Sequence, residues 1–197
     1  MDLRSSFTLD QLAVCETRPD LVDPRGYSAR DKSRDGTFVH VRAIRPDDAE
    51  RLVECFTAMS PESIRARWHG MKSAMTAGEI VAATAVARND HVGLVATVWI
   101  DGGERIIGLA SFFVDSWSEP RRAEVALTVL DEWQGRGIGS ILFDHLARLA
   151  RRCGMEELTA EVLVPNARML RIFVKSGLPV EVERAGPEAR VRLALAS

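Results

Sequence analysis

The sequence lacks an apolar run long enough to span a bilayer, and its first residues lack the apolar core of a signal peptide. It also lacks an excess of charge of one sign, because 26 Lys and Arg residues against 28 Asp and Glu residues give a net charge of −2. This balance argues against a protein whose whole surface binds nucleic acid or anionic lipid. These features predict a cytoplasmic protein that binds neither membranes nor nucleic acid, with any anion site confined to a small part of its surface.

Cysteine and histidine are both scarce. The three cysteines, Cys15, Cys55 and Cys153, are odd in number and form no C-x-x-C motif, which indicates reduced thiols rather than a disulfide framework. The four histidines show no metal-ligand spacing with one another or with the cysteines. We therefore predict no metal site.

The composition is that of one globular domain. Of the 197 residues, 46% are hydrophobic and 27% are charged, and a chain of this length can fold without a disulfide or a structural metal. Residues 1–36 contain prolines, glycines and many charges, and they predict an N-terminal arm, partly ordered or flexible, that can hold one short helix around Leu9 to Val14. Residues 37–197 are predicted to form the domain itself.

The order of elements in this domain predicts an α/β protein. One strand at 38–44 precedes three helices, which begin after Pro46, at Ser60-Pro61 and at about Thr76. Three β-rich runs joined by short turns then predict an antiparallel meander, followed by a helix, a strand, a further helix and two strands. The spans predicted after the third helix are 91–100, 104–115, 121–131, 138–152, 157–164, 166–176, 178–183 and 189–195.

The stretch from Ala123 to Ser140, AEVALTVLDEWQGRGIGS, carries the clearest chemical signal. Alternate residues of its strand form an apolar face, which leaves Glu124 on the other face. Every second residue from 135 to 139 is glycine, at the point where a helix begins. Glycine lets a ligand approach the backbone closely, and the free N–H groups of a helix start favour a phosphate by about 0.3–1 kcal/mol. The segment therefore predicts a cradle for a pyrophosphate.

Three other interpretations of the glycines compete with this one. A dinucleotide fingerprint G-x-G-x-x-G that begins at Gly135 would need glycine where Ser140 stands, and its strand would have to open a βαβ unit. A P-loop would need a lysine, and residues 123–140 contain none. A glycine-rich turn that binds no ligand stays open, because an isolated glycine motif is a weak signal.

The motif Gln134-Gly135-Arg136-Gly137-Ile138-Gly139 resembles the Q/R-x-x-G-x-G/A signature of the GCN5-related N-acetyltransferases, the GNAT superfamily. The resemblance extends over roughly residues 37–195. It implies a GNAT acetyltransferase domain over 37–197, with a mixed, mostly antiparallel central sheet, helices on both faces, and acetyl-CoA as co-substrate. In that family the loop amides hold the pyrophosphate and the preceding strand pairs with the pantetheine arm. The cofactor-binding residues that the resemblance implies are Leu127, Thr128, Val129, Gln134, Gly135, Arg136, Gly137, Gly139, Ser140 and Asn166.

Three longer blocks, DGTFVHVRAIRPDDAERL, SPESIRARWHG and AEVALTVLDEWQGRGIG, are similar to the catalytic domain of bacterial protein lysine acetyltransferases. The similarity implies direct transfer of the acetyl group to a lysine side chain of a protein, such as an acyl-CoA synthetase. These enzymes place their general-base glutamate in the context AEVA, which implies that Glu124 is the catalytic base. Many of them carry a fused regulatory or synthetase-like domain, and from the short arm we expect none here.

Alternatives to this function and to this base stay open. The domain could acetylate a small amine, or it could be a non-catalytic CoA-binding module. Glu124 could instead be an exposed strand residue paired with Arg121 or Arg122.

Several other side chains are ambiguous. Many GNAT enzymes have a tyrosine general acid where Phe173 stands here, so we assign no general acid and expect Phe173 in the core with Met169 and Leu170. Trp99, in a strand, is predicted to be buried, and Trp117, in a loop, could border the acceptor cleft. Four basic residues could bind cofactor phosphates or lie on solvated helix faces, namely Arg136, Arg168, Arg171 and Lys175.

Overall fold

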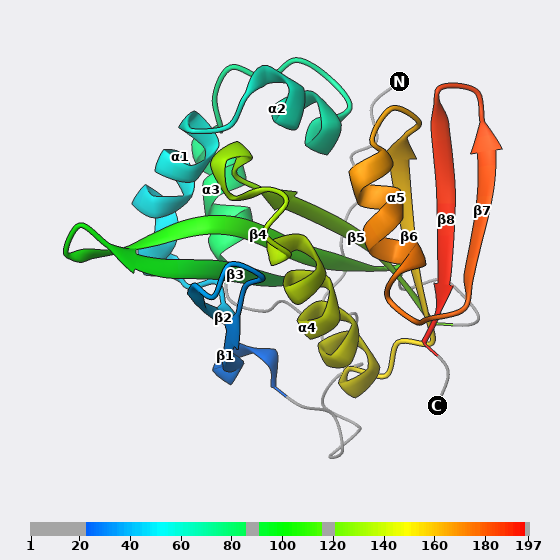
Figure 1. The fold of residues 1–197 in the computed structure, drawn as a ribbon, viewed down its shortest axis with the longest axis horizontal. Coiled ribbons are helices and arrows are strands. Elements are labelled where there is room, and N and C mark those ends of the chain that lie inside the picture. The colour runs from blue at the N-terminus through cyan, green and yellow to red at the C-terminus, as the bar shows by residue number, and fades with distance from the viewer. Residues whose placement is uncertain (1–22, 86–90, 116–120, 196–197) are drawn as a thin grey trace.

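A single sheet organises the chain. The computed structural model describes residues 23–85, 91–115 and 121–195 (Figure 1). Its eight-stranded sheet has the order β1-β2-β3-β4-β5-β6-β8-β7, and every neighbouring pair is antiparallel except β5 and β6, which run parallel. The strands are β1 (Ser28–Lys32), β2 (Phe38–Ala43), β3 (His91–Ile100), β4 (Gly103–Asp115), β5 (Arg122–Val129), β6 (Glu157–Leu163), β7 (Val180–Ala185) and β8 (Glu188–Ala194).

The helices lie on both faces of this sheet, so the predicted α/β fold with a mixed, mostly antiparallel sheet is confirmed (Figure 1). No helix in the described parts of the chain is both long and apolar enough to cross a membrane. The α-helices are α1 (Ala49–Thr57), α2 (Pro61–Trp68), α3 (Ala77–Thr84), α4 (Ile138–Arg152) and α5 (Ala167–Val174).

Side chains that cap the first turn explain where three helices begin. The Ser60 side chain accepts a hydrogen bond from the Ser63 amide and Pro61 opens α2, while Thr76 and Glu79 form a reciprocal capping box at α3. The Asn166 side chain accepts from the Met169 amide and caps α5. Each cap satisfies an N–H group that the helix itself leaves free, so the predicted helix starts are correct.

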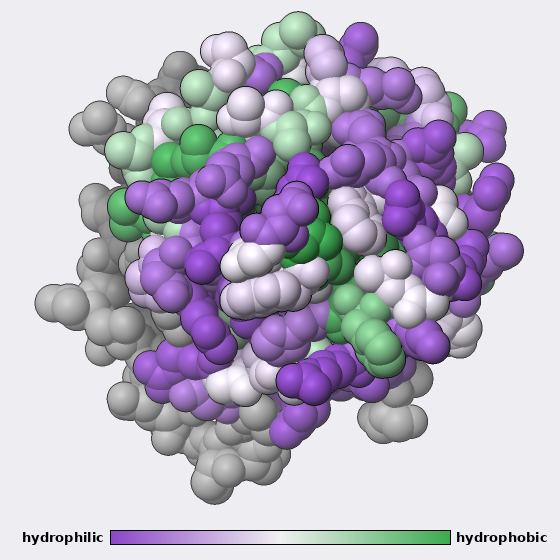
Figure 2. All heavy atoms as spheres, turned by 60° about the vertical axis from the view of Figure 1, so that its left-hand side comes forward, coloured by the Kyte–Doolittle hydropathy of each residue, from purple (hydrophilic) through white to green (hydrophobic). Residues whose placement is uncertain are grey.

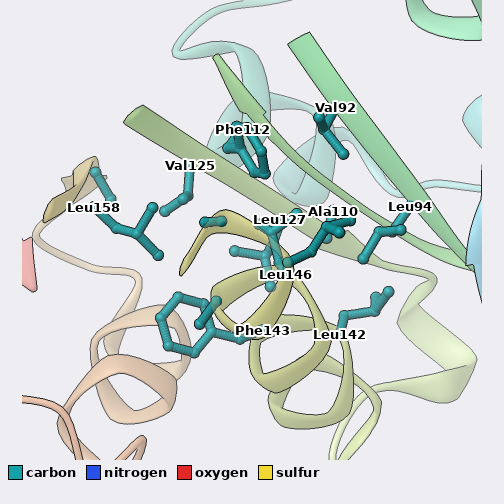
Figure 3. Close-up of a cluster of buried hydrophobic side chains, with 14 of the residues drawn as sticks. Val92, Leu94, Ala110, Phe112, Val125, Leu127, Leu142, Phe143, Leu146 and Leu158 are labelled. Atoms are coloured by element: carbon teal, nitrogen blue, oxygen red, sulfur yellow. The ribbon is translucent and has the colours of Figure 1, made fainter. Parts of the chain in front are cut away.

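The larger core lies between the sheet and helices α4 and α5. Leu142, Phe143 and Leu146 of α4 point at the apolar face of the central strands (Figure 3). The alternation of β5 is as predicted, because its odd-numbered residues from 123 to 127 are buried in this core. Phe173 is fully buried as expected, with its ring edge-on to Phe143 at a centroid distance of 5.1 Å.

A smaller apolar cluster holds α1 to the opposite face. Leu52, Cys55 and Met59 pack there against Ile44 and other buried strand residues. Cys55 is a buried free thiol. A β-bulge shapes the strands beneath, since Ala96 pairs with Gly108 whereas Thr97 pairs with Ile106, which leaves Ile107 as an extra residue on β4.

A buried ionic network fastens the start of α1 to the sheet. Arg42 donates two hydrogen bonds of 2.7 Å to the two oxygens of Asp48 and also contacts Glu104 at 2.9 and 3.0 Å. Arg42 is 2% exposed and the Asp48 side chain 0%. Although burial raises the pKa of the Asp48 carboxyl, the hydrogen bonds from Arg42 and from the Arg45 amide outweigh it and lower that pKa below its ordinary value. Residues 45–49, the RPDDA part of the first sequence block, therefore hold the start of α1 on the sheet.

The N-terminal edge of the sheet differs from expectation. Residues 28–32, predicted to belong to the arm, form β1, which pairs with β2. Tyr27 Oη lies 2.5 Å from His145 Nδ1, and Asp31 Oδ2 lies 3.3 Å from His145 Nε2, so this edge is tied to α4. β1 contains no buried residue, and its sequence SARDK therefore gave no apolar signal. The helix predicted around Leu9 to Val14 and the residue Cys15 lie outside the described residues.

The prediction that Trp99 is buried is wrong, because its side chain is 74% exposed. Trp99 pairs with Glu104 beside the β3–β4 turn, and the neighbouring Val98 carries the buried position there. Phe38 of β2 is also exposed. Figure 2 shows that polar side chains dominate the molecular face on this side, with apolar patches between them. Trp117 lies outside the described residues.

Candidate active site

The two parallel strands at the centre of the sheet separate soon after they meet. β5 and β6 pair only from Arg122 opposite Glu157 to Glu124 opposite Thr159. From Val125 to Val129, β5 pairs with β4 alone, so within the described residues its other edge has no strand partner. A free strand edge presents N–H and C=O groups that an extended ligand can bind as an added strand. The predicted pantetheine residues Leu127, Thr128 and Val129 lie on this edge.

The glycine loop follows β5 and a short 3-10 helix (Asp131–Trp133) and leads into the first turn of α4. Gly135 and Gly137 have φ values of 77° and 90°, in the region that favours glycine. Within the described residues, no backbone amide from Gly135 to Ser140 donates a hydrogen bond to a protein acceptor. A Cβ added to Gly135 would meet nothing within 4 Å, so the loop is open on that side. Free amides at a helix start form an anion site, which fits a pyrophosphate.

Gly139 has a reason of its own to be glycine. A Cβ at this position would lie 2.7 Å from Cδ1 of Ile172, so the absence of a side chain lets α4 and α5 approach closely. Asn166 caps α5 through its side-chain oxygen. Gly139 therefore has a packing role and Asn166 a capping role, in addition to the predicted contact with a cofactor.

Gln134 links β5 to α5 beside the free edge of β5. Its Nε2 donates to the Val129 carbonyl at 3.0 Å, and its Oε1 accepts from Arg168 of α5. Of the four predicted basic residues, Arg136 and Arg168 lie beside the loop, while Arg171 and Lys175 are exposed on α5 and at its end.

The β1–β2 turn also packs on the loop, which the sequence did not reveal. The Arg34 amide donates to the Arg136 carbonyl at 2.9 Å, and the Arg34 side chain lies against Gly137. Asp35 Oδ2 pairs with Arg136 Nη1 at 3.1 Å, and Arg136 stacks over the Trp133 ring at 4.7 Å. Hydrogen bonds from Ser33 and Thr37 lower the pKa of Asp35 to about 2, so a negative charge stands beside the predicted phosphate site.

Glu124 lies on the face of β5 opposite the α4 core, in register between Phe113 and Thr159. Its side chain is exposed and lines a recess of about 510 Å³. Within the described residues Glu124 has no hydrogen bond or ion pair, whereas Arg122 pairs with Glu157 at 2.8 Å. The alternative in which Glu124 pairs with Arg121 or Arg122 therefore does not describe this structure.

The charge of Glu124 acts electrostatically on Arg67 of α2. Burial lowers the pKa of the Arg67 guanidinium, and the negative charge of Glu124 opposes that shift. The start of α2 is held in place by Asp131, which accepts hydrogen bonds from the Ser60 amide at 2.9 Å and from the Ser63 hydroxyl at 2.8 Å. The SPES block thus fixes α2 to the loop that follows β5, and Arg67 of that helix lines a neighbouring cavity between the sheet and α1, α2 and α3.

One group of side chains has donor atoms suited to a metal ion. His69, Glu161 and Glu188 have ligand atoms within 4.8 Å of one another. His69 Nδ1 lies 3.0 Å from Glu188 Oε1, and Glu161 contacts Arg190 at 3.3 Å. Existing pairs thus account for these charges, and spacing along the chain gave no hint of the group because its members come from three distant segments.

Comparison with known proteins shows which family the chain belongs to. The family model described as the acetyltransferase (GNAT) family matches residues 49–178. The chain belongs to the GNAT family of acetyltransferases. It is therefore an enzyme that transfers an acyl group, and GNAT acetyltransferases use acetyl-CoA. The free β5 edge and the glycine loop are the features of this GNAT domain that suit such a co-substrate.

Similar GNAT proteins include the acetyltransferase Pat of Mycolicibacterium smegmatis, 31% identical over 144 residues, which cover 73% of this chain and 42% of Pat. The chain thus spans less than half the length of that relative. The solved GNAT domain of S. lividans PAT is 32% identical, with a TM-score of 0.76, over 85% of this chain and 96% of that one. The structure of yncA from Salmonella typhimurium, described with its cofactor acetyl-CoA, is 20% identical with a TM-score of 0.63, over 81% and 95% of the two chains, and shares the fold.

Proposed function

We propose that this GNAT acetyltransferase transfers the acetyl group of acetyl-CoA directly to a lysine side chain of a protein, such as an acyl-CoA synthetase, with Glu124 as general base. The observation that carries the proposal is the position of Glu124, which lies in a recess where β5 separates from β6 and has no ion pair among the residues that the structure describes. The names of Pat and of S. lividans PAT, whose sequences are 31% and 32% identical, support a protein acceptor.

In this proposal the co-substrate lies between β5 and β6, beyond the point where the two strands separate. The edge of β5 along Leu127, Thr128 and Val129, apart from the Val129 carbonyl that accepts from Gln134, offers backbone groups to the pantetheine arm. The amides of Gly135, Arg136, Gly137, Gly139 and Ser140 face the pyrophosphate, with added charge from Arg136 and Arg168. Gln134 and Asn166 hold the ends of β5 and α5 beside it.

The proposed reaction is a single displacement. The acceptor nitrogen bonds to the thioester carbonyl carbon, the C–S bond breaks, and CoA leaves as a thiolate. Glu124 removes the proton that the amine must lose, either directly or through one water. A lysine amine with a pKa of about 10.4 is protonated at pH 7, and its neutral form lies about 4.6 kcal/mol higher, so the site needs such a base.

The thiolate takes its proton from water in this scheme. Phe173, at the position of the family tyrosine, is buried in the core, and the hydroxyl of Tyr27 contacts His145 instead. A thiol pKa of about 8.5 makes the thiolate a tolerable leaving group without a dedicated acid.

The direct test incubates the protein with labelled acetyl-CoA and a panel of acyl-CoA synthetases. We expect label on a lysine of at least one synthetase and none when that lysine is replaced by arginine. Turnover of small amines without labelling of any protein would favour the small-amine enzyme. Binding of CoA without transfer to any acceptor would indicate a CoA-binding module.

Binding of the co-substrate is expected to stabilise the fold. A ligand that binds only the native state raises the melting temperature, by about 5–10 °C at about 100 times its Kd for a chain of this size. A thermal-shift comparison should show this rise with acetyl-CoA and with CoA, and none with NAD. A rise with NAD alone, or no rise with either CoA species, would overturn the co-substrate assignment.

Asp35 is expected to weaken CoA binding, because its carboxylate pairs with Arg136 beside the phosphate site. The Asp35→Asn variant keeps an oxygen that can accept from the Thr37 amide but removes the charge, and it should bind CoA up to about fivefold more tightly at low salt. Calorimetry against Asp47→Asn, an exposed acid at the start of α1, provides the control. Equal affinities in the two variants would contradict the prediction.

A further inference from the structure

A largely apolar cavity of about 340 Å³ lies between the sheet and helices α1, α2 and α3. Its floor is the same face of β3, β4 and β5 that carries Glu124. Its roof includes Phe56 of α1, Trp68 of α2 and Ala83 of α3. The proposed transfer of an acetyl group makes no use of a cavity of this size, since cavities from about 300 Å³ hold whole small ligands.

The pairing register of β3, β4 and β5 explains why this cavity reaches the free edge of β5. Gly93 of β3 lies opposite Ser111 of β4, and Ser111 lies opposite Ala126 of β5, so small residues from three strands lie side by side in the floor. Ala126 belongs to the stretch of β5 whose other edge has no strand partner. A group held on that free edge therefore has the end of the cavity beside it.

The cavity and the recess of Glu124 differ in chemistry. The recess is lined mainly by charged side chains, among them Glu157, Glu161 and Arg190, whereas the cavity lining is mainly apolar. They share Phe113, and Glu124 and Ala126 are successive residues on one face of β5. A thioester at this point thus has a polar approach on one side and an apolar space on the other.

We propose that the cavity receives the alkyl chain of the acyl donor, so that the enzyme uses straight-chain acyl-CoA thioesters longer than acetyl-CoA. This inference rests on the proposed function, which places the thioester on the free edge of β5. The bond changes are those of acetyl transfer: the acceptor nitrogen gains the acyl carbon, the C–S bond breaks, Glu124 takes the proton and CoA thiolate leaves. The alkyl chain takes no part in these steps and only leaves water for the cavity.

Binding by calorimetry tests the inference without an acceptor. Each methylene that leaves water for an apolar site favours binding by about fourfold, so hexanoyl-CoA should bind at least about tenfold more tightly than acetyl-CoA. Ala83→Leu adds bulk to the roof over β3, away from β5. In this variant the preference for hexanoyl-CoA should fall to about threefold or less, and the Kd of acetyl-CoA should stay within about twofold. Ala82→Leu, also in the lining, provides a second filled variant.

Val81→Leu is the matched control, because Val81 lies on α3 with its side chain 67% exposed and does not line the cavity. It should keep the wild-type preference and the wild-type melting temperature. Transfer assays with acetyl-CoA and hexanoyl-CoA then use the acceptor that is labelled best in the synthetase panel.

The outcomes separate the two proposals. Acetyl transfer with at least tenfold weaker binding of hexanoyl-CoA would overturn the acyl cavity and leave the proposed function intact. If Ala83→Leu and Ala82→Leu both keep the wild-type preference for hexanoyl-CoA, the alkyl chain of the donor binds outside the cavity. A higher acceptor KM in Ala83→Leu that is equal for every donor would assign the cavity to the acceptor. Absence of binding of any acyl-CoA would remove the proposed function itself.

Discussion

Replacing Glu124 by glutamine is expected to lower kcat/KM for acetyl transfer by about 10²–10⁴-fold, the contribution typical of a positioned general base. Glutamine is close in size but cannot take a proton. Because the side chain has no ion pair within the described residues, its replacement should break no structural contact. The Kd of acetyl-CoA and the melting temperature should therefore stay at wild-type values.

The pH profile distinguishes a base from a residue that only shapes the site. The Glu124→Gln variant should regain activity as the pH approaches about 10, where the acceptor amine loses its proton unaided. Glu183→Gln, an exposed carboxylate on β7 outside the recess, is the control and should retain full activity. Full activity and an unchanged profile in Glu124→Gln would mean that another group removes the proton.

Replacing Asp48 by alanine is expected to destabilise the fold by about 3–5 kcal/mol, because removal of one partner from a buried ion pair leaves the other without compensation. Arg42 would keep Glu104, whose side chain is 20% exposed, but would lose both of its hydrogen bonds to Asp48. The Arg45 amide would also lose its acceptor. Denaturant unfolding, with the slope checked for two-state behaviour, measures the difference.

The contribution of Asp48 should depend on pH in a defined direction. Its pKa in the folded protein lies below the ordinary value of 3.8, so the carboxylate stabilises the fold above that pH, and this stabilisation is lost as the pH falls through the lowered pKa. Wild type and variant should therefore converge in acid. Asp23→Asn, which removes an exposed pair with Arg25, should leave the unfolding midpoint unchanged. A midpoint shift in Asp48→Ala as small as that of this control would contradict a stabilising role for the buried pair of Arg42 and Asp48.

Local patterns predicted much of the fold. Alternation along β5 placed Glu124 opposite the core, and Ser60 and Asn166 marked helix starts correctly, because strand faces and caps depend on residues close in sequence. The antiparallel meander of β3, β4 and β5 followed from short turns, as at Asp101 and Gly102, where φ is positive.

Contacts between distant segments were not predictable in this way. The pairing of Asp35 with Arg136 joins residues 101 positions apart, and Asp131 reaches Ser60 across 71. β1 carries no apolar pattern of its own and is held by its pairing with β2 and by Tyr27. Trp99 was misplaced because strand residues of one type are buried or exposed according to which helix covers them.

Ile107, the extra residue of the β-bulge, limits how the length of β4 can change among related sequences. Deletion of this one residue would restore one-to-one pairing of β4 with β3 and leave Leu109, Ser111 and Phe113 on their present face. It would, however, remove a fully buried side chain from the core and the carbonyl that accepts from the Leu130 amide. Related sequences can lengthen or shorten the hairpin tips freely, but a loss here would leave a gap in the core and remove the bulge that twists the two strands. Natural variation in length should therefore avoid the segment between Arg105 and Phe113.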